Sequence, residues 1–229
     1  MNEQLDRIKS KLEQLKIFDK DLELFGADTH EYLLNPVLTS EQVAQFETDY
    51  KIDLPKEYVS FLTTIGNGGA GLFYGVHTLE DSRINFFDNT EEGNHQYFDL
   101  SKAFPHTPSW NVETELLELY EKIEKANEAG NEELEEELFE QKWEIIGGEE
   151  HDFGRLSTAD YGCGVTISLI VNGQEKGNMW TDDRTNDAGL YPTIELGNKG
   201  KITFLDWYEL WLDNSLEEIQ SKTQTKHLR

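Results

Sequence analysis

The sequence predicts an α+β fold in which a largely antiparallel sheet is partly covered by helices. Three observations predict it. Amphipathic helical patterns stand near both ends of the chain, an alternating apolar run with an Asn-Gly turn lies in its second half, and a glutamate-rich helical pair precedes that run. Helices that cover part of a meandering sheet satisfy this order.

The first elements are helices. Residues 2–17 carry leucine and isoleucine at helical spacing, which predicts an amphipathic helix, and we expect residues 1–20 to be a helical extension of the main domain. A second helix begins near Thr39, where Gln42 three positions later completes a capping box. A third begins at Pro55, because proline suits the first helical position.

Two segments after these helices have the composition of strands. Residues 71–79 (GLFYGVHTL) and 84–87 (INFF) are rich in aromatic and β-branched residues, which predicts strand structure for both. The polar stretch at 88–109 contains Pro105 and Pro108, and it predicts a loop with little regular structure.

The clearest hairpin lies in the second half. Apolar residues alternate from Val165 to Val171, Asn172-Gly173 forms the turn, and the return strand runs from Gly177 to Thr181. A short strand begins at Tyr191 and a closing helix at about Thr203, where Asp206 completes a capping pair. The main domain is expected to span residues 21–220, and residues 221–229 are expected to fray.

An acidic insertion is expected at about residues 110–150. Between Glu113 and Glu150 there are fifteen glutamates and three lysines, which gives a local charge of −12. Apolar residues at helical spacing on both sides of Gly130-Asn131 predict a helical hairpin with one apolar seam. Its glutamates form either a solvated face or a docking surface for a cationic partner, with Tyr120, Phe139 and Trp143 as candidate apolar anchors.

The overall charge ranks the possible partners. With 46 acidic and 20 basic residues the net charge is −26, which repels nucleic acid and anionic membranes and attracts a basic protein, although solubility alone also explains it. The single cysteine allows no intramolecular disulfide and fits a reducing compartment. No secretory signal and no apolar stretch near the ~20 residues that cross a bilayer is visible, so we expect a cytoplasmic protein.

No motif favours catalysis, a cofactor or a metal. The glycine-rich NGGAG at 67–71 follows a helix and precedes a strand, the reverse of a phosphate loop. Cys163 has no catalytic signature around it, so a buried, inert thiol is expected. The segment DDRTND at 182–187 lacks the spacing of a calcium loop and predicts a structured turn with Arg184 paired to an aspartate. We therefore expect a protein that is not an enzyme.

Several stretches resemble the SMI1/KNR4 (SUKH) superfamily. In LPKEYVSFLTTIGNGG (54–69), Leu-Pro opens a helix with an aromatic stripe that ends in Asn-Gly-Gly. The later segments CGVTISLIVNG (163–173), GNMW (177–180) and FLDWYELWL (204–212) resemble its second half. The resemblance covers roughly residues 36–88 and 152–216, and the extension before residue 20 and the acidic hairpin depart from the compact family pattern.

The resemblance implies a binding role. Bacterial members of the family are immunity proteins of polymorphic toxin systems, often against nucleases, and fungal members are regulatory scaffolds. We therefore expect a protein of the immunity type that neutralises a basic toxin domain in a stoichiometric complex; the alternative is an intracellular scaffold or adaptor with endogenous protein partners. The oligomeric state is not predicted. Candidate partner-binding residues are acidic side chains of the hairpin and the residues of an expected sheet-edge loop: Glu133, Glu135, Glu136, Glu137, Trp180, Asp182 and Asp183.

Overall fold

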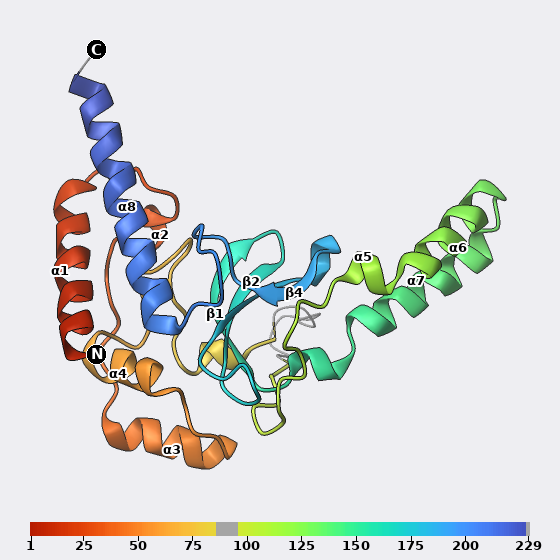
Figure 1. Cartoon of the computed structure of the whole chain (residues 1–229), viewed down its shortest axis with the longest axis horizontal. Helices are drawn as coiled ribbons and strands as arrows, with labels where there is room; N and C mark the ends of the chain where they lie inside the picture. Colours follow the sequence, from red (N-terminus) through yellow and green to blue (C-terminus); the bar gives the residue numbers. More distant parts are fainter. Residues whose placement is uncertain (86–95, 228–229) are drawn as a thin grey trace.

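Helix α1 (Asn2–Phe18) lies against the long closing helix α8 (Phe204–His227) in the computed structural model, which describes residues 1–85 and 96–227 (Figure 1). The predicted amphipathic pattern of α1 is confirmed, because its leucine and isoleucine side chains are buried in the same core as α8. Glu209 of α8 accepts hydrogen bonds from Arg7 at 2.7 Å and Lys11 at 2.8 Å. The two ends of the chain are therefore joined side by side.

The next helices are α2 (Ala27–His30), α3 (Ser40–Tyr50) and α4 (Lys56–Thr64). The predicted capping box is present, since the Thr39 side chain accepts from the Gln42 backbone and the Gln42 side chain accepts from the Thr39 backbone. Pro55 precedes α4 as its cap residue. Helix α4 then packs aromatic side chains against α8, with the Phe61 and Phe204 rings 5.0 Å apart.

The prediction of strands at 71–79 and 84–87 was wrong for the residues that the structure describes. Only isolated bridges form there, such as Gly69 with Val76 and Val76 with Ala159, and residues 86–87 lie outside the described part. Phe73 and Gly75 both have a positive φ, which breaks the extended backbone. The apolar residues of this segment serve the main core instead of a strand ladder.

The sheet is antiparallel throughout, in the order β1 (Arg155–Gly162), β2 (Val165–Ile170), β3 (Met179–Asp183) and β4 (Gly189–Pro192). It confirms the predicted α+β class and the hairpin of β2 with β3. Strand β1 was missed, and β4 begins two residues before the expected Tyr191.

Both faces of the sheet are covered. Leu169 and Met179 face the main core beneath the helices, whereas Ile170, Trp180 and Leu190 pack with Phe104 in a smaller cluster on the other face. Each of the six residues of β2 is therefore buried, although neighbouring side chains point to opposite sides.

The acidic insertion forms a projecting arm, which we define as α5 (Val112–Glu115), α6 (Leu117–Glu128) and α7 (Glu132–Ile146). The predicted break is confirmed: Gly130 takes a positive φ, and the Asn131 side chain caps α7 by accepting from the Leu134 backbone. Figure 1 shows the arm on the opposite side of the sheet from α1 and α8, pointing away from the body.

Helix α8 continues to His227, so residues 221–227 of the end that we expect to fray are helical. Two features extend the helix. Lys222 pairs with Glu218 one turn earlier at 2.7 Å and donates to the Glu23 backbone carbonyl, and Ile219 is buried in the main core. Residues 228–229 lie outside the described part.

Candidate functional site

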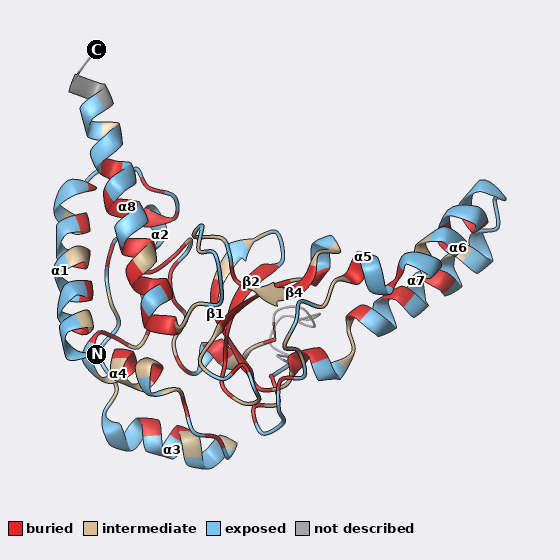
Figure 2. Cartoon of the chain, in the orientation of Figure 1, coloured by how far each residue is buried: buried red, intermediate tan, exposed pale blue. Residues whose placement is uncertain are grey.

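The arm presents an acidic surface on a thin apolar seam. Its buried apolar residues form two small clusters, Val112, Leu116 and Ile146 at the base, and Ile123 and Ala126 of α6 against Leu138 of α7 further out. Figure 2 shows exposed residues over most of the surface of α6 and α7. Of the predicted glutamates, Glu133, Glu136 and Glu137 are exposed, and Glu135 is half-buried where it accepts from Asn127 at 3.0 Å.

The lysines of the arm neutralise little of this charge. Lys142 points toward the body and pairs with Asp187 at 3.0 Å, and Lys125 reaches Glu121 only at 3.9 Å. Residues 113–150 contain fifteen glutamates and only three lysines, so the surface of the arm has a strong negative potential.

Large apolar side chains stand exposed among these glutamates. Phe139 and Trp143 are 40% and 48% exposed, and they lie one helical turn apart, so they share a face of α7. Exposed aromatic side chains of this kind are frequent anchors of protein interfaces once a partner covers them. Tyr120, the third anchor predicted, points inward instead, with the Lys142 ammonium 5.0 Å from its ring.

The base of the arm is held by what we call the clamp: Arg184, His151 and the Lys142–Asp187 pair. Arg184 donates to the Ile146 carbonyl at 2.9 Å, and His151 Nε2 lies 3.2 Å from the Ile145 carbonyl. The last carbonyls of a helix have no partner within the helix, so side chains of the body supply one here. The clamp fixes the end of α7 to the body.

Behind the clamp lies a buried ion cluster of Asp152, Arg155, Asp182 and Arg184. Arg184 bridges the two aspartates at 2.8 Å each, and Arg155 reaches them at 2.6 and 2.7 Å. Burial by itself raises the pKa of the Asp182 carboxyl, but the charges of Arg184 and Arg155 outweigh burial and hold that pKa well below its usual value. The predicted pairing of Arg184 with an aspartate is confirmed.

The prediction that Trp180, Asp182 and Asp183 form a sheet-edge loop was wrong. They lie on β3, an interior strand, where Trp180 is 1% and Asp182 4% exposed. Trp180 fills the smaller core with Phe104, Asp182 belongs to the ion cluster, and half-buried Asp183 accepts from Asn186 at 2.7 Å. Trp180 and Asp182 therefore do not meet a partner directly.

Two stacked histidines complete the base of the arm. His106 Nε2 lies 2.9 Å from His151 Nδ1, and Trp110 packs against the His151 ring. Burial lowers the pKa of His106 to about 4, helped by the charge of His151, Arg155 and Arg184. Burial likewise lowers the pKa of His151, and Arg184 adds to this. Both rings are neutral at pH 7, and no group of metal-binding side chains was found among the described residues.

Cys163 also departs from expectation, because the thiol is exposed and not buried. It lies in the tight turn between β1 and β2 with φ +54°, between Gly162 and Gly164, which have positive φ as well. The sequence YGCGV reads as the start of a strand, whereas its three consecutive left-handed residues make the turn itself.

Comparisons with known proteins found no match to a family model, to a curated protein or to a solved structure. The resemblance to the SMI1/KNR4 superfamily therefore stays a prediction. Among the described residues, none of the helices combines the length and the apolar character that a membrane span needs.

Proposed function

We propose that this chain is a non-catalytic binding protein that captures a cationic protein with its arm and neutralises it in a stoichiometric complex. The partner class that we favour is a toxin domain, including nuclease domains, as in polymorphic toxin systems. The observation that carries the proposal is the arm itself: a projecting helical pair with a charge of −12 over residues 113–150 and exposed aromatic anchors.

The charge of the arm decides between a foreign partner and a second copy. Exposed apolar residues on a helical pair favour association, and two arms packed together would bury them. Such a dimer would bring two surfaces of −12 into contact, and like charges at an interface cost several kcal/mol. A basic partner gains from the same field. Nuclease toxins fit this requirement because their substrate-binding clefts are basic.

Charge and apolar anchors have separate tasks in this proposal. The glutamates accelerate encounter and select basic partners, and their effect declines with salt. Phe139 and Trp143 supply affinity once they are covered. The clamp holds the arm in one position before binding, which reduces the entropy that association costs.

The test is co-expression with a basic toxin domain, chosen first from any that a neighbouring gene encodes, followed by affinity measurement. Glu133→Lys, Glu136→Lys and Glu137→Lys together should abolish protection and weaken binding at least tenfold, while the chain still folds. A matched control reverses three exposed acidic residues on the α1 and α8 side, namely Asp6, Asp21 and Glu217. It changes the total charge equally and should leave binding within about threefold.

Two results would contradict the proposal. Equal losses in both triple variants would mean that total charge, and not the arm, attracts the partner. Absence of a complex, with unchanged toxicity, would remove the immunity function. A pull-down from cells without any toxin then separates the alternative, because a scaffold recovers a reproducible set of endogenous proteins and an immunity protein does not.

A further inference from the structure

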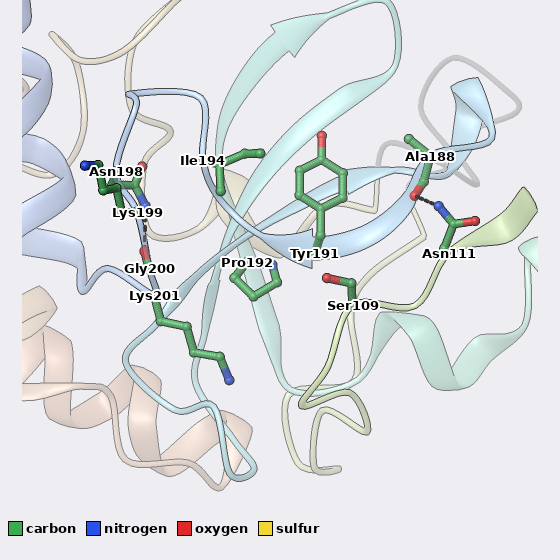
Figure 3. Close-up of a pocket in the computed structure, with 10 residues that line it drawn as sticks. All are labelled: Ser109, Asn111, Ala188, Tyr191, Pro192, Ile194, Asn198, Lys199, Gly200 and Lys201. Atoms are coloured by element: carbon green, nitrogen blue, oxygen red, sulfur yellow. Dashed lines mark hydrogen bonds between the residues drawn. The ribbon is translucent and has the colours of Figure 1, made fainter. Parts of the chain in front are cut away.

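A groove lies where the arm meets the edge strand β4. It consists of two open depressions that share Asn111 and Ala188, one of about 630 Å³ on the body and one of about 510 Å³ at the base of the arm. Figure 3 shows the first, with Asn198–Lys201 at one end, Asn111 and Ala188 at the other and Tyr191 between them. Each volume lies within the range typical of ligand sites.

The chemistry of the groove changes along its length. Its middle is apolar, formed by Tyr191, Pro192, Ile194 and Ala188, and Ile194 is 59% exposed. The arm end carries Glu113 and Asp187 beside Leu117, which is 57% exposed.

The opposite end carries Lys199 and Lys201, but only one of these is available. The Lys201 ammonium donates to the Glu175 carboxylate and to the Thr107 carbonyl at 3.0 Å. Lys199 is exposed at the end of the depression. At the arm end, Asp187 is paired with Lys142 and its other oxygen is buried, so the exposed Glu113 is the available carboxylate. The groove thus has a negative end and a positive end separated by an apolar floor.

Strand addition to β4 is excluded as a way to fill the groove. The N–H and C=O of Leu190 point away from β3, and both already form hydrogen bonds of 2.8 Å with the Trp110 backbone. Trp110 comes so close only because residue 189 is glycine, since a Cβ there would lie 2.0 Å from the Trp110 carbonyl oxygen. The next outward position is Pro192, which has no N–H to donate. An occupant must therefore be bound through its side chains.

We propose that the groove binds an extended peptide segment of the partner, with a basic side chain at Glu113, an apolar middle on Tyr191 and Ile194, and a carboxylate at Lys199. This inference rests on the proposed function, because the charge of the arm attracts the protein that carries the segment. The groove determines the direction of the bound segment. A reversed segment would place like charges together at both ends of the groove.

The test uses the full chain labelled with ¹⁵N and two short synthetic peptides at millimolar concentration. Each peptide has two arginines at one end, leucine and phenylalanine in the middle and an aspartate at the other, and the two differ in chain direction. At least one should shift the amide signals of residues 109–111 and 188–201. The signals of the arm tip at 129–131 should stay in place.

Three variants sharpen the test. Ile194→Asp should weaken peptide binding about tenfold, because the peptide loses one apolar contact with the groove. Lys199→Glu should weaken peptide binding about threefold, which is the size of effect expected when one exposed ion pair is lost. The matched control Ile17→Asp replaces another exposed isoleucine, on α1, and should change nothing.

Absence of shifts with both peptides, shifts confined to the arm tip, or equal weakening by Ile17→Asp would each overturn the groove proposal. These outcomes differ from failure of the proposed function. If reversal of the arm glutamates abolishes toxin binding while the peptides leave the groove signals unchanged, the arm remains the binding element and the groove is not part of it.

Discussion

The body and the arm are stabilised by different interactions. In the body, one continuous core connects α1, α4, the sheet and α8, and large side chains such as Trp207 and Tyr208 are completely buried. The arm has only two small apolar clusters of three buried residues each, and polar contacts add to the one at its base. Most of the folding stability therefore comes from the body. The arm adds a large exposed surface and contributes little stability.

The largest expected effect comes from the body. Phe204→Ala removes a completely buried ring that contacts Tyr58 and Phe61, and it should lower the free energy of unfolding by about 3–5 kcal/mol. Urea denaturation followed by circular dichroism measures this loss. A loss below about 1 kcal/mol would contradict the assignment of stability to this core.

The same kind of substitution in the arm should act locally. Leu138→Ala removes a buried side chain from the thin seam, which should cost about 2 kcal/mol, the low end for such a change, because the site lies close to solvent. Hydrogen exchange should accelerate in α6 and α7 and stay unchanged in β2 and α8. Uniform acceleration over the whole chain would show that arm and body unfold as one unit.

Acid should act at the junction of the two regions. The pKa of His106 is about 4 in the folded chain against an ordinary value of 6.5, so the unfolded chain binds more protons between these values. Stability should therefore fall as pH decreases from about 6.5 toward 4. The charged groups that influence His106 are His151, Arg155, Arg184 and Glu150, and only Glu150 favours its protonated form.

The control for the acid effect is His106→Gln, which retains a hydrogen-bond donor and does not titrate. Urea midpoints measured from about pH 7.5 to about pH 5 should decline less steeply in this variant than in the parent. Equal slopes would assign the acid sensitivity to other groups, such as His151, whose pKa burial also lowers.

The smallest effect is expected on the surface of the arm. Glu133→Gln, Glu136→Gln and Glu137→Gln together should change stability by less than about 0.5 kcal/mol, with a slight gain because mutual repulsion declines. Thermal unfolding of the variant and the parent measures this difference. A clear loss of stability would mean that these carboxylates hold the fold, and it would weaken their assignment to partner binding.

Local sequence patterns predicted local structure well. The periodicity of α1, the capping box at Thr39 and the break at Gly130 depend on neighbouring residues, and the structure contains all three. The β2–β3 hairpin is also present, but its turn is longer than the predicted Asn172-Gly173 pair, because Gly177 donates to the Ile170 carbonyl. Phe139 and Trp143, named as candidate anchors, are exposed, although Trp143 also has the spacing of the seam. The function of this surface was left open between solvation and docking.

Long-range contacts were the part that sequence could not supply. Residues 71–79 look like a strand because they are apolar, but left-handed residues at 73 and 75 direct them into the core. The clamp joins Arg184 to Ile146, and the ion cluster joins Asp152 to Asp182, pairs that no spacing reveals. Asp182 was placed in an exposed sheet-edge loop, whereas it is one of the acidic residues that lie inside because arginines accompany them.

The exposed thiol in the β1–β2 turn has a practical consequence. Asn186, which lines the groove, donates to the Cys163 carbonyl at 3.3 Å, so the turn lies directly beside the place where arm and body meet. Because the chain has no other cysteine, a maleimide dye would attach at this one position without any engineering. Its emission would then follow occupancy of the junction in real time on the native molecule.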